Sequence, residues 1–328
     1  MRRREFDGRG CTLVNTQHGP ILTLSADVAD AIAGGRPVVA LESTLLSHGL
    51  PPGRNLAVAR RLERTVRDAG AVPATIAVLD GTARVGLTDA ELERVCAPDA
   101  GLDKLSLRDV GAAVALGRSG ATTVASTAAL AAAAGVAVFA TGGLGGVHHP
   151  VPGESVTWDV SADLATLART GVLVVCSGMK SILDIAATLE VLETQSVPVL
   201  GYRTDDFPAF YLRSSGHRVP HRVDDPARAA AVVAAHRRFS DSGVLLANPV
   251  PGEHELDRAV HDRLLAEGLE LLRERGVSGS DVTPVLLEHF HTASGGASLD
   301  ANEALVVANA ALAGQVAGEL TTLAERTR

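Results

Sequence analysis

One lysine, Lys180, stands where a side-chain amine could do chemistry, directly after an apolar run and a small turn. Residues 172–175 are apolar and mostly β-branched, which favours a strand buried on both faces, and Ser177-Gly178 ends it. Residues 181–192 then read as an amphipathic helix. This order would place Lys180 at the carboxyl edge of a sheet, where open α/β folds bind their ligands.

A lysine amine in that place can lose its water, attack an electrophilic carbon and form an imine. Lys180 is therefore a candidate catalytic nucleophile. The alternative is a solvated lysine at the start of a helix, because most lysines are exposed.

A carboxylate at the end of the first expected core strand is the second candidate. Residues 37–41 are an apolar run that ends in Glu42, and a loop rich in turn-forming residues follows as far as Gly53. An ionised carboxylate at the end of a buried strand is costly unless it is paired or protonated. Glu42 is therefore a candidate general acid or base, and a hydrogen-bonded structural carboxylate is the alternative.

Two segments have the composition of an anion site. Lys104, one of the few lysines in this arginine-rich chain, precedes an expected helix from Leu107 and would suit a phosphate. Residues 121–127 are small and polar and run into an alanine-rich helix, so that hydroxyls and free helix N–H groups come together. A plain surface lysine explains Lys104 as well.

Two loops could complete a site. The glycine-rich residues 141–149 follow an expected strand and could line a phosphate or sugar, or could form a tight structural crossing. Asp159 precedes a helix that Ser161 would cap. The carboxylate of Asp159 would then lie in the loop, where it could bind a divalent ion. One carboxylate helped by waters suits magnesium or manganese better than zinc, although helix capping alone could explain both Asp159 and Asp163.

Composition excludes several classes of protein. The chain has 328 residues, of which 46% are hydrophobic, and 38 acidic against 30 basic residues, with no cluster of basic and aromatic side chains that would suit nucleic acid. Three scattered cysteines favour neither a disulfide framework nor a zinc cage, so a reducing cytoplasm is the expected location. We see no secretory signal and no apolar stretch of membrane length.

The remaining elements predict one domain. Residues 1–24 are expected to be a loose arm, followed by a helix over residues 25–33. Strands are expected at 72–79, 136–140, 197–202 and 243–247, with helices at 54–69, 225–238 and 253–275. No linker or repeat divides residues 25–328, which we predict to be one α/β domain with a helical C-terminal layer.

Several motifs in a fixed order resemble the pseudouridine-5'-phosphate glycosidase family, also called the pseudouridylate synthase or indigoidine-synthase-A-like family. They occupy residues 39–44, 47–51, 141–148, 159–164 and 176–184, and the resemblance continues through residues 206–211 and 248–249. It spans about residues 20 to 320. The family implies a single three-layer α/β/α domain with a largely parallel or mixed central sheet, and a homotrimer.

The resemblance also implies an activity, the reversible cleavage of the C–C glycosidic bond of pseudouridine 5'-phosphate to uracil and ribose 5-phosphate. By matched position Lys180 would be the nucleophile, Glu42 the proton donor and Asp159 the ligand of Mn2+, with Mg2+ or another divalent metal as a substitute. Substrate contacts would come from Lys104, Val124, Ser161, Ala162 and Asp163. Residues expected behind these are His48, Thr141, Gly142, Gly143, His148 and Asn302.

A C–C glycosidic bond has no heteroatom leaving group to protonate, so the family's chemistry opens the sugar ring and passes through a lysine-linked adduct. Two readings compete with it, another Schiff-base sugar-phosphate lyase or aldolase, and a sugar-phosphate-binding protein without turnover. The sequence departs from the family at His149-Pro150 and at Val307-Ala308. We expect neither nucleic acid nor membrane as a partner.

Overall fold

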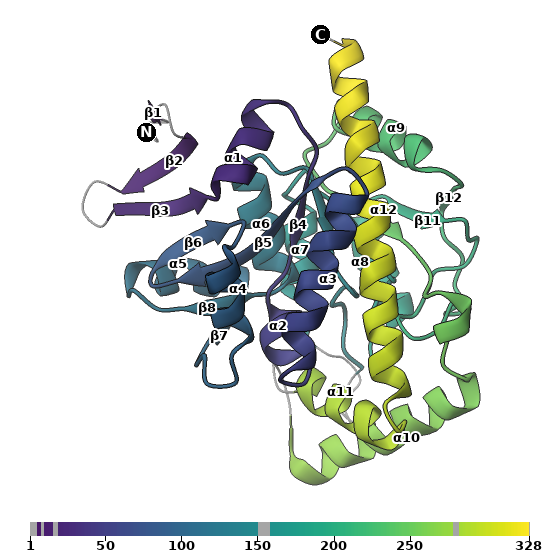
Figure 1. Cartoon of the computed structure of the whole chain (residues 1–328). Coiled ribbons are helices and arrows are strands. Elements are labelled where there is room, and N and C mark those ends of the chain that lie inside the picture. The colour runs from purple at the N-terminus through teal and green to yellow at the C-terminus, as the bar shows by residue number, and fades with distance from the viewer. Residues whose placement is uncertain (1–4, 8–9, 16–18, 150–157, 278–281, 328) are drawn as a thin grey trace.

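The computed structural model describes residues 5–7, 10–15, 19–149, 158–277 and 282–327 (Figure 1). Its centre is a run of parallel strands in the order β5 (Val72–Leu79), β4 (Val38–Leu41), β9 (Val138–Ala140), β10 (Leu173–Cys176), β13 (Val244–Ala247), β11 (Val199–Tyr202) and β12 (His221–Val223). Because β4, β9 and β10 are neighbours and parallel, the segments that follow them leave the sheet side by side.

The sheet becomes mixed beyond β5. Strand β6 (Thr82–Val85) and strand β8 (Gly120–Thr122) both pair antiparallel with β5, and β7 (Asp103–Leu105) pairs parallel with β8. Strand β3 (Gly19–Leu24) pairs parallel with β6, and β2 (Gly10–Asn15) and β1 (Glu5–Asp7) extend this edge.

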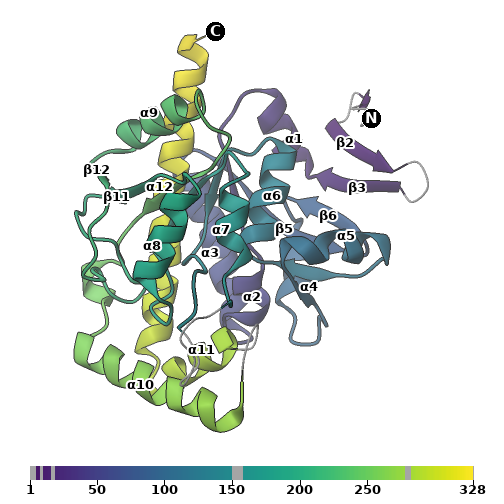
Figure 2. The ribbon, with the colours of Figure 1, turned by 180° about the vertical axis from the view of Figure 1, so that it is seen from behind.

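Helices cover both faces of the sheet. Helices α3 (Arg54–Asp68), α9 (Pro226–His236) and α12 (Ala297–Thr327) form one layer, in which α12 contacts both α3 and α9. The opposite view shows α6 (Val124–Ala134), α7 (Ala162–Leu167) and α8 (Ile185–Thr194) over the other face (Figure 2). The three-layer α/β/α fold with a mixed sheet is confirmed.

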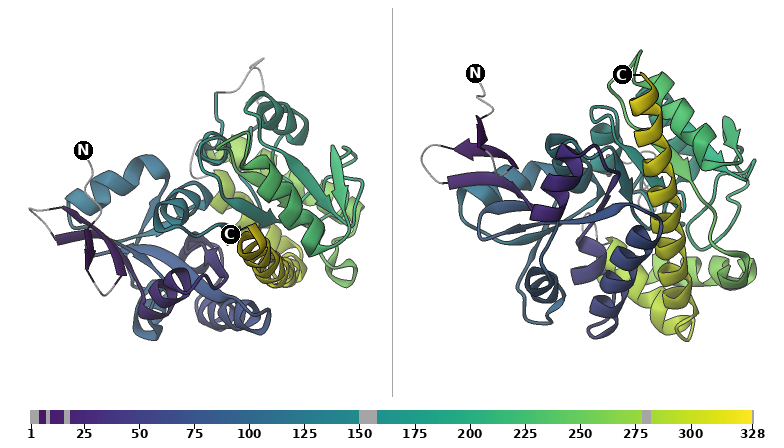
Figure 3. Two further views of the ribbon diagram at one scale, coloured as in Figure 1. Left: turned by 90° about the horizontal axis from the view of Figure 1, so that it is seen from above. Right: turned by 45° about the horizontal axis from the view of Figure 1, so that its top comes forward.

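The remaining helices lie at the ends and edges of the sheet. Helices α1 (Ala26–Ala33), α4 (Asp89–Cys96) and α5 (Leu107–Ala115) belong to the N-terminal half, where Ser25 caps α1 and Thr88 forms a capping box at α4. Helices α10 (Arg258–Arg275) and α11 (Val282–Ala293) pack on each other below the sheet as Figure 3 shows, on the side of the short helix α2 (Thr44–His48). With α12, they make the C-terminal part of the chain helical, as the sequence predicts.

Four expectations about local structure were wrong. The arm before residue 25 is not loose where β3 joins the sheet, and Leu22 of β3 is buried. The expected loop after Glu42 contains α2. The helix expected from residue 181 begins at Ile185, and the helix expected from residue 253 begins at Arg258 after a turn of 3-10 helix at Gly252–His254.

The late helix starts have a common cause. Asp184 accepts a hydrogen bond from the backbone N–H of Ala187, and Asp257 accepts one from that of Val260, so each aspartate is an N-cap and fixes where the helix begins. An apolar pattern does not distinguish a capped start from the turn before it. The small polar run at residues 121–127 likewise divides into the end of β8 and the start of α6.

Helix α12 is long and apolar enough to cross a membrane by length and composition, a feature that the sequence analysis missed. Half of its most apolar window is buried, and the helix contacts β4, β9 and β10 as well as α3 and α9. A core helix that lies along a sheet passes the same test.

Core packing predicts a contrast between two phenylalanines. Phe139, in the interior strand β9, is completely buried, whereas Phe239 is 90% exposed. We expect Phe139→Ala to lower the free energy of unfolding by about 3 to 5 kcal/mol. Phe239→Ala should change it by no more than about 0.5 kcal/mol. Urea unfolding of both variants checks this, and similar losses in the two would contradict the assigned core.

Candidate active site

The carboxyl edge of β4, β9 and β10 opens into a cavity of about 250 Å³, near the lower end of the range for small-molecule sites. Glu42 follows β4, the glycine-rich loop follows β9, and the turn with Lys180 follows β10. All three segments line the cavity, so the structure brings together what the sequence places more than 130 residues apart, between Glu42 and Lys180.

The turn before Lys180 is fixed by its backbone. Gly178 has φ +74°, and a Cβ there would lie 1.9 Å from the carbonyl oxygen of Pro208, so only glycine fits. The carbonyl of Gly178 accepts a hydrogen bond from the N–H of Leu144 at 2.9 Å, and the N–H of Lys180 donates to the carbonyl of Leu144 at 3.2 Å. Lys180 is therefore joined to the glycine-rich loop before any ligand binds.

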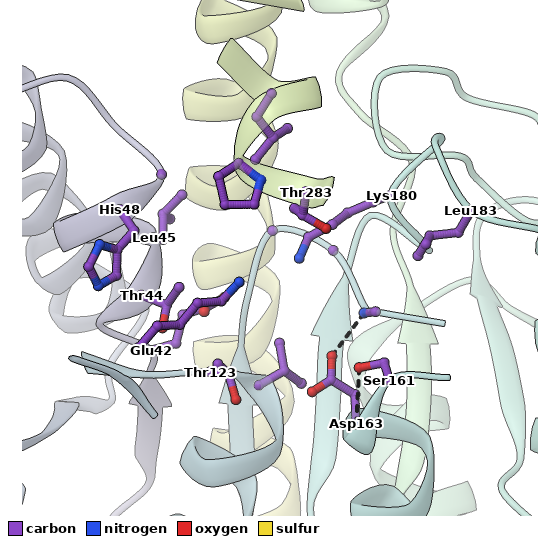
Figure 4. Close-up of a pocket in the computed structure, with 18 of the residues that line it drawn as sticks. Glu42, Thr44, Leu45, His48, Thr123, Ser161, Asp163, Lys180, Leu183 and Thr283 are labelled. Carbon is purple, nitrogen blue, oxygen red and sulfur yellow. Dashed lines mark hydrogen bonds between the residues drawn. The ribbon is translucent and has the colours of Figure 1, made fainter. Parts of the chain in front are cut away.

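Lys180 and Lys104 are the only two lysines among the 30 basic residues Lys and Arg of the sequence, and both line this cavity. Figure 4 shows Lys180 entering the cavity opposite the side that holds Glu42 and His48. Lys104 comes from strand β7 and not from a helix start. Two amines in one cavity suit an anionic ligand and leave one of them available for covalent chemistry.

Glu42 is held in its protonated form to a higher pH than an ordinary glutamate. Burial in the protein raises the pKa of its carboxyl, and a short hydrogen bond from the hydroxyl of Thr141 and the charge of Lys180 oppose this rise only in part. An acid with a raised pKa holds its proton to a higher pH and can donate it, so the geometry suits a general acid.

Two histidines of the cavity are held neutral. Burial lowers the pKa of His48, and the charge of Lys104 lowers it further. Burial also lowers the pKa of His148. The charge of Asp159 opposes this effect, and the charge of Lys180 lowers the pKa further. His148 and Asp159 face each other, with Nδ1 and Oδ2 4.0 Å apart. Neutral imidazoles can donate or accept hydrogen bonds to an uncharged ligand group.

Asp163 has a structural role that the sequence did not reveal. Its two carboxylate oxygens accept hydrogen bonds from the backbone N–H groups of Ala125 and Gly145, each at 2.9 Å. The anion at the start of α6, expected from the small polar run, is therefore at least in part a carboxylate of the protein itself. A Cβ on Gly145 would lie 2.7 Å from this carboxylate, which explains the glycine.

The other expected site residues divide into those that line the cavity and two that do not, Ala162 and Thr141. Ala162 is exposed on α7 and is not among the residues that line the cavity, and Thr141 lies behind Glu42. The Oδ1 atom of Asn302 is buried without a hydrogen-bond partner in the described part of the chain, which leaves an acceptor for a ligand. Lining the cavity are Lys104, Val124, Ser161, Asp163, Asp159, His48, Gly142, Gly143, His148 and Asn302.

Several lining residues were missed by the sequence analysis. Helix α11 contributes Thr283, Pro284 and Leu287, and Phe210 comes from the segment between β11 and β12. Phe210 lies in a motif that carried the family resemblance, but nothing local gave it a place in the site. Thr44 and Leu45 enter through the unexpected helix α2.

The residues that could hold a metal ion are few. Within residues 5–7, 10–15, 19–149, 158–277 and 282–327 there is no group of three or more His, Cys, Asp or Glu side chains with the spacing of a metal site. Asp159 and neutral His148 could hold a divalent ion that keeps several waters, which is how Mg2+ and similar ions often bind. The residues fit such a weakly held ion and do not fit a closed structural site.

The two departures from the family pattern lie in different places. Pro150 is outside the described residues. Val307 and Ala308 are partly buried on α12 and do not line the cavity, so their difference from the pattern does not alter its described lining.

Comparison with known proteins gives one consistent group of relatives. The model of the family described as indigoidine synthase A like protein matches residues 27–319. A protein of Salinispora tropica named pseudouridine-5'-phosphate glycosidase is 54% identical over 97% of this chain and 96% of its own length. A protein of the same name from Saccharopolyspora erythraea is 53% identical over 90% of this chain and 96% of its own.

Solved structures agree with the fold. The prealnumycin C-glycosynthase AlnA, in complex with ribulose 5-phosphate, superimposes with a TM-score of 0.85 at 41% identity and covers 93% of this chain and 99% of its own. An indigoidine synthase A-like protein of Thermotoga maritima gives a TM-score of 0.82 at 37% identity, over 92% of this chain and 97% of its own.

The hydrogen bond from Thr141 predicts how the acidity of Glu42 can be changed. Thr141→Val removes the hydroxyl that stabilises the ionised carboxylate, so the pKa of Glu42 should rise further. Thr141→Ser keeps the hydroxyl and should leave it near the wild-type value. Carbon-13 NMR titration of the Glu42 carboxyl, assigned with Glu42→Gln, measures this pKa. An unchanged or lower pKa in Thr141→Val would refute the proposed role of the hydroxyl.

Proposed function

We propose, from the premise that this chain belongs to the indigoidine synthase A-like family, that it cleaves the C–C glycosidic bond of pseudouridine 5'-phosphate reversibly. The products are uracil and ribose 5-phosphate. The observation that carries the proposal is the meeting of a partly buried acid, Glu42, and both lysines of the chain in one cavity. Relatives of more than half-identical sequence bear the name of this activity.

The first step opens the sugar ring. The carboxylic acid of Glu42 donates its proton to the ring oxygen O4' as the C1'–O4' bond breaks, and the Lys180 amine forms a bond to C1'. The electron pair of the broken bond goes to O4', which becomes a hydroxyl. The raised pKa of Glu42, caused by burial, supports this role, because the acid holds its proton to a higher pH than an ordinary glutamate.

The second step breaks the C–C bond. The adduct nitrogen first gives its extra proton to the Glu42 carboxylate, and its lone pair then forms a C=N double bond to C1'. The electron pair of the C1'–C5 bond leaves with uracil, whose C5 takes up that proton from Glu42. Water then adds to the imine and releases ribose 5-phosphate and the free amine. Each step is reversible, so synthesis uses the same residues.

The rest of the cavity would bind and orient the substrate. The charge of Lys104 suits the phosphate, and phosphate binding energy would hold C1' against the Lys180 amine. Contacts from Val124, Ser161 and Asp163 stay predictions, as do the homotrimer and the cytoplasmic location. Ala162 is exposed and does not line the cavity, so it could contact the substrate only if the substrate extends beyond this lining.

A divalent ion is a further part of the proposal. Asp159, with His148 beside it and waters, would hold Mn2+ or a similar ion, which would supply positive charge next to the bound substrate. The residues of the chain, and not the ion, perform the proton and amine chemistry proposed above.

Turnover tests the two catalytic roles. We expect the wild-type protein to release uracil from pseudouridine 5'-phosphate, and Lys180→Arg to release none, because a guanidinium keeps the charge but cannot form an imine. Glu42→Gln should lower kcat by about 10² to 10⁴-fold. Uracil release by chromatography measures both. A folded wild-type protein that binds ribose 5-phosphate without releasing uracil would contradict the activity, and carbonyl substrates turned over without uracil would indicate an aldolase.

Metal binding can be tested without turnover. Asp159→Asn should weaken Mn2+ binding by about 10-fold or more, since loss of a supporting group already costs that much at many metal sites. The electron paramagnetic resonance signal of free Mn2+ in a titration gives the affinity. Asp99→Asn, a change of an exposed carboxylate outside the cavity lining, serves as the control. Equal affinities in the two variants would remove Asp159 from the ion's ligands.

A further inference from the structure

Asn309 of α12 makes hydrogen bonds to the ends of three neighbouring strands. Its side-chain Nδ2 donates to the carbonyl oxygen of Thr141 at 2.8 Å and to the hydroxyl of Ser177 at 3.1 Å. Its Oδ1 accepts from Nδ2 of Asn248 at 3.0 Å. Thr141 follows β9, Ser177 follows β10 and Asn248 follows β13, so one amide from the helical layer contacts three adjacent strand ends.

The orientation of this amide is fixed by its partners. The carbonyl of Thr141 can only accept a hydrogen bond, so the NH2 group of Asn309 must face it, and the oxygen must face Asn248. Asn309 and Ser177 are completely buried. A buried amide with both its ends satisfied resists displacement, because moving it would leave polar groups without partners.

Asn309 is connected to each of the two reacting groups through one hydrogen-bonded residue. On one side, the hydroxyl of Thr141 donates to the Glu42 carboxylate. On the other, Ser177 is three residues before Lys180 in the turn that Leu144 holds. Asn309 itself is not among the residues that line the cavity. Its Nδ2 also lies 3.4 Å from the carbonyl oxygen of Gly142, which does line the cavity. Asn309 is connected to the acid through Thr141 and to the amine through Ser177.

We infer that Asn309 is a positioning residue. Its buried amide clamps the ends of β9, β10 and β13 together and thereby fixes the positions of the Glu42 acid and the Lys180 amine relative to each other. This inference rests on the proposed function for its catalytic consequence. Misplacing reacting groups by about 1 Å can cost about 100-fold in rate, so loss of the clamp should act on kcat. Among the residues that the structure describes, Asn309 hydrogen-bonds to no side chain of the cavity lining and reaches the lining at the Gly142 carbonyl, 3.4 Å away, so KM should change little.

Asn309→Asp tests the clamp with almost no change of shape. The variant replaces the NH2 donor by an oxygen that faces the carbonyl of Thr141, so the bond to β9 is lost. We expect kcat for uracil release to fall by about 10 to 100-fold, with KM within about 3-fold of wild type. Val316→Ala is the matched control, because Val316 is completely buried two turns further along α12 and has no hydrogen-bonding side chain.

Asn309→Asp and Val316→Ala are compared at a temperature where both are folded by circular dichroism. A merely structural role predicts that both variants lose thermal stability and that neither changes kcat once the folded fraction is counted. That outcome would overturn the inference, and so would a rise in KM with kcat unchanged. If Asn309→Asp does not fold, Ser177→Ala removes one contact of the same amide and should lower kcat by a smaller factor.

A second readout separates this inference from the proposed function. Amide hydrogen exchange, followed by mass spectrometry, should speed up by about 10-fold or more in residues 141–147 and 176–182 of Asn309→Asp, and should stay at the wild-type rate there in Val316→Ala. A wild-type protein that releases no uracil defeats the proposed function alone. Equal exchange of these two segments in both variants defeats the clamp, whatever the reaction is.

Discussion

No side chain can be placed at residue 178, because its Cβ would meet the backbone of Pro208, and the position of Lys180 depends on that constraint. With glycine there, the turn after β10 comes close enough to the loop after β9 for Leu144 to bond both Gly178 and Lys180. Lys180, the proposed nucleophile, is therefore held by backbone hydrogen bonds between two strand ends and does not lie on a free loop. Such a site is preorganised, which lowers the cost of bringing amine and substrate together.

The charges of the cavity follow from the same close packing. Glu42 is partly buried in the cavity wall, where it accepts a hydrogen bond from the Thr141 hydroxyl, and the effect of burial on its pKa outweighs the effects that favour its ionised form. Lys104 and Lys180 add positive charge that keeps His48 and His148 neutral together with burial. The result is an acid with a raised pKa, two imidazoles with lowered pKa values and two lysine side chains around one cavity. This combination suits an anionic substrate that must be protonated at an oxygen and attacked at carbon.

The sequence predicted the parts of the site that follow a strand directly. Glu42, the glycine-rich loop and Lys180 each follow an apolar run, and parallel neighbouring strands bring such positions to one edge. It could not predict that Leu287 of α11 would line the same cavity, because that contact joins residues far apart in the chain with no local pattern. Nor could the sequence predict that the Asp163 carboxylate accepts hydrogen bonds from two backbone N–H groups, because the same residue pattern fits a substrate contact or a helix cap.

The most direct test of a reacting Lys180 is chemical trapping during turnover. The protein is mixed with pseudouridine 5'-phosphate, reduced with borohydride and digested for peptide mass mapping. The chain has only two lysines, so the modified amine can be assigned without ambiguity. The account predicts a reduced pentose-phosphate adduct on the peptide that contains Lys180, and none without borohydride. Uracil release with an adduct on Lys104, or with no adduct on either lysine, would contradict it.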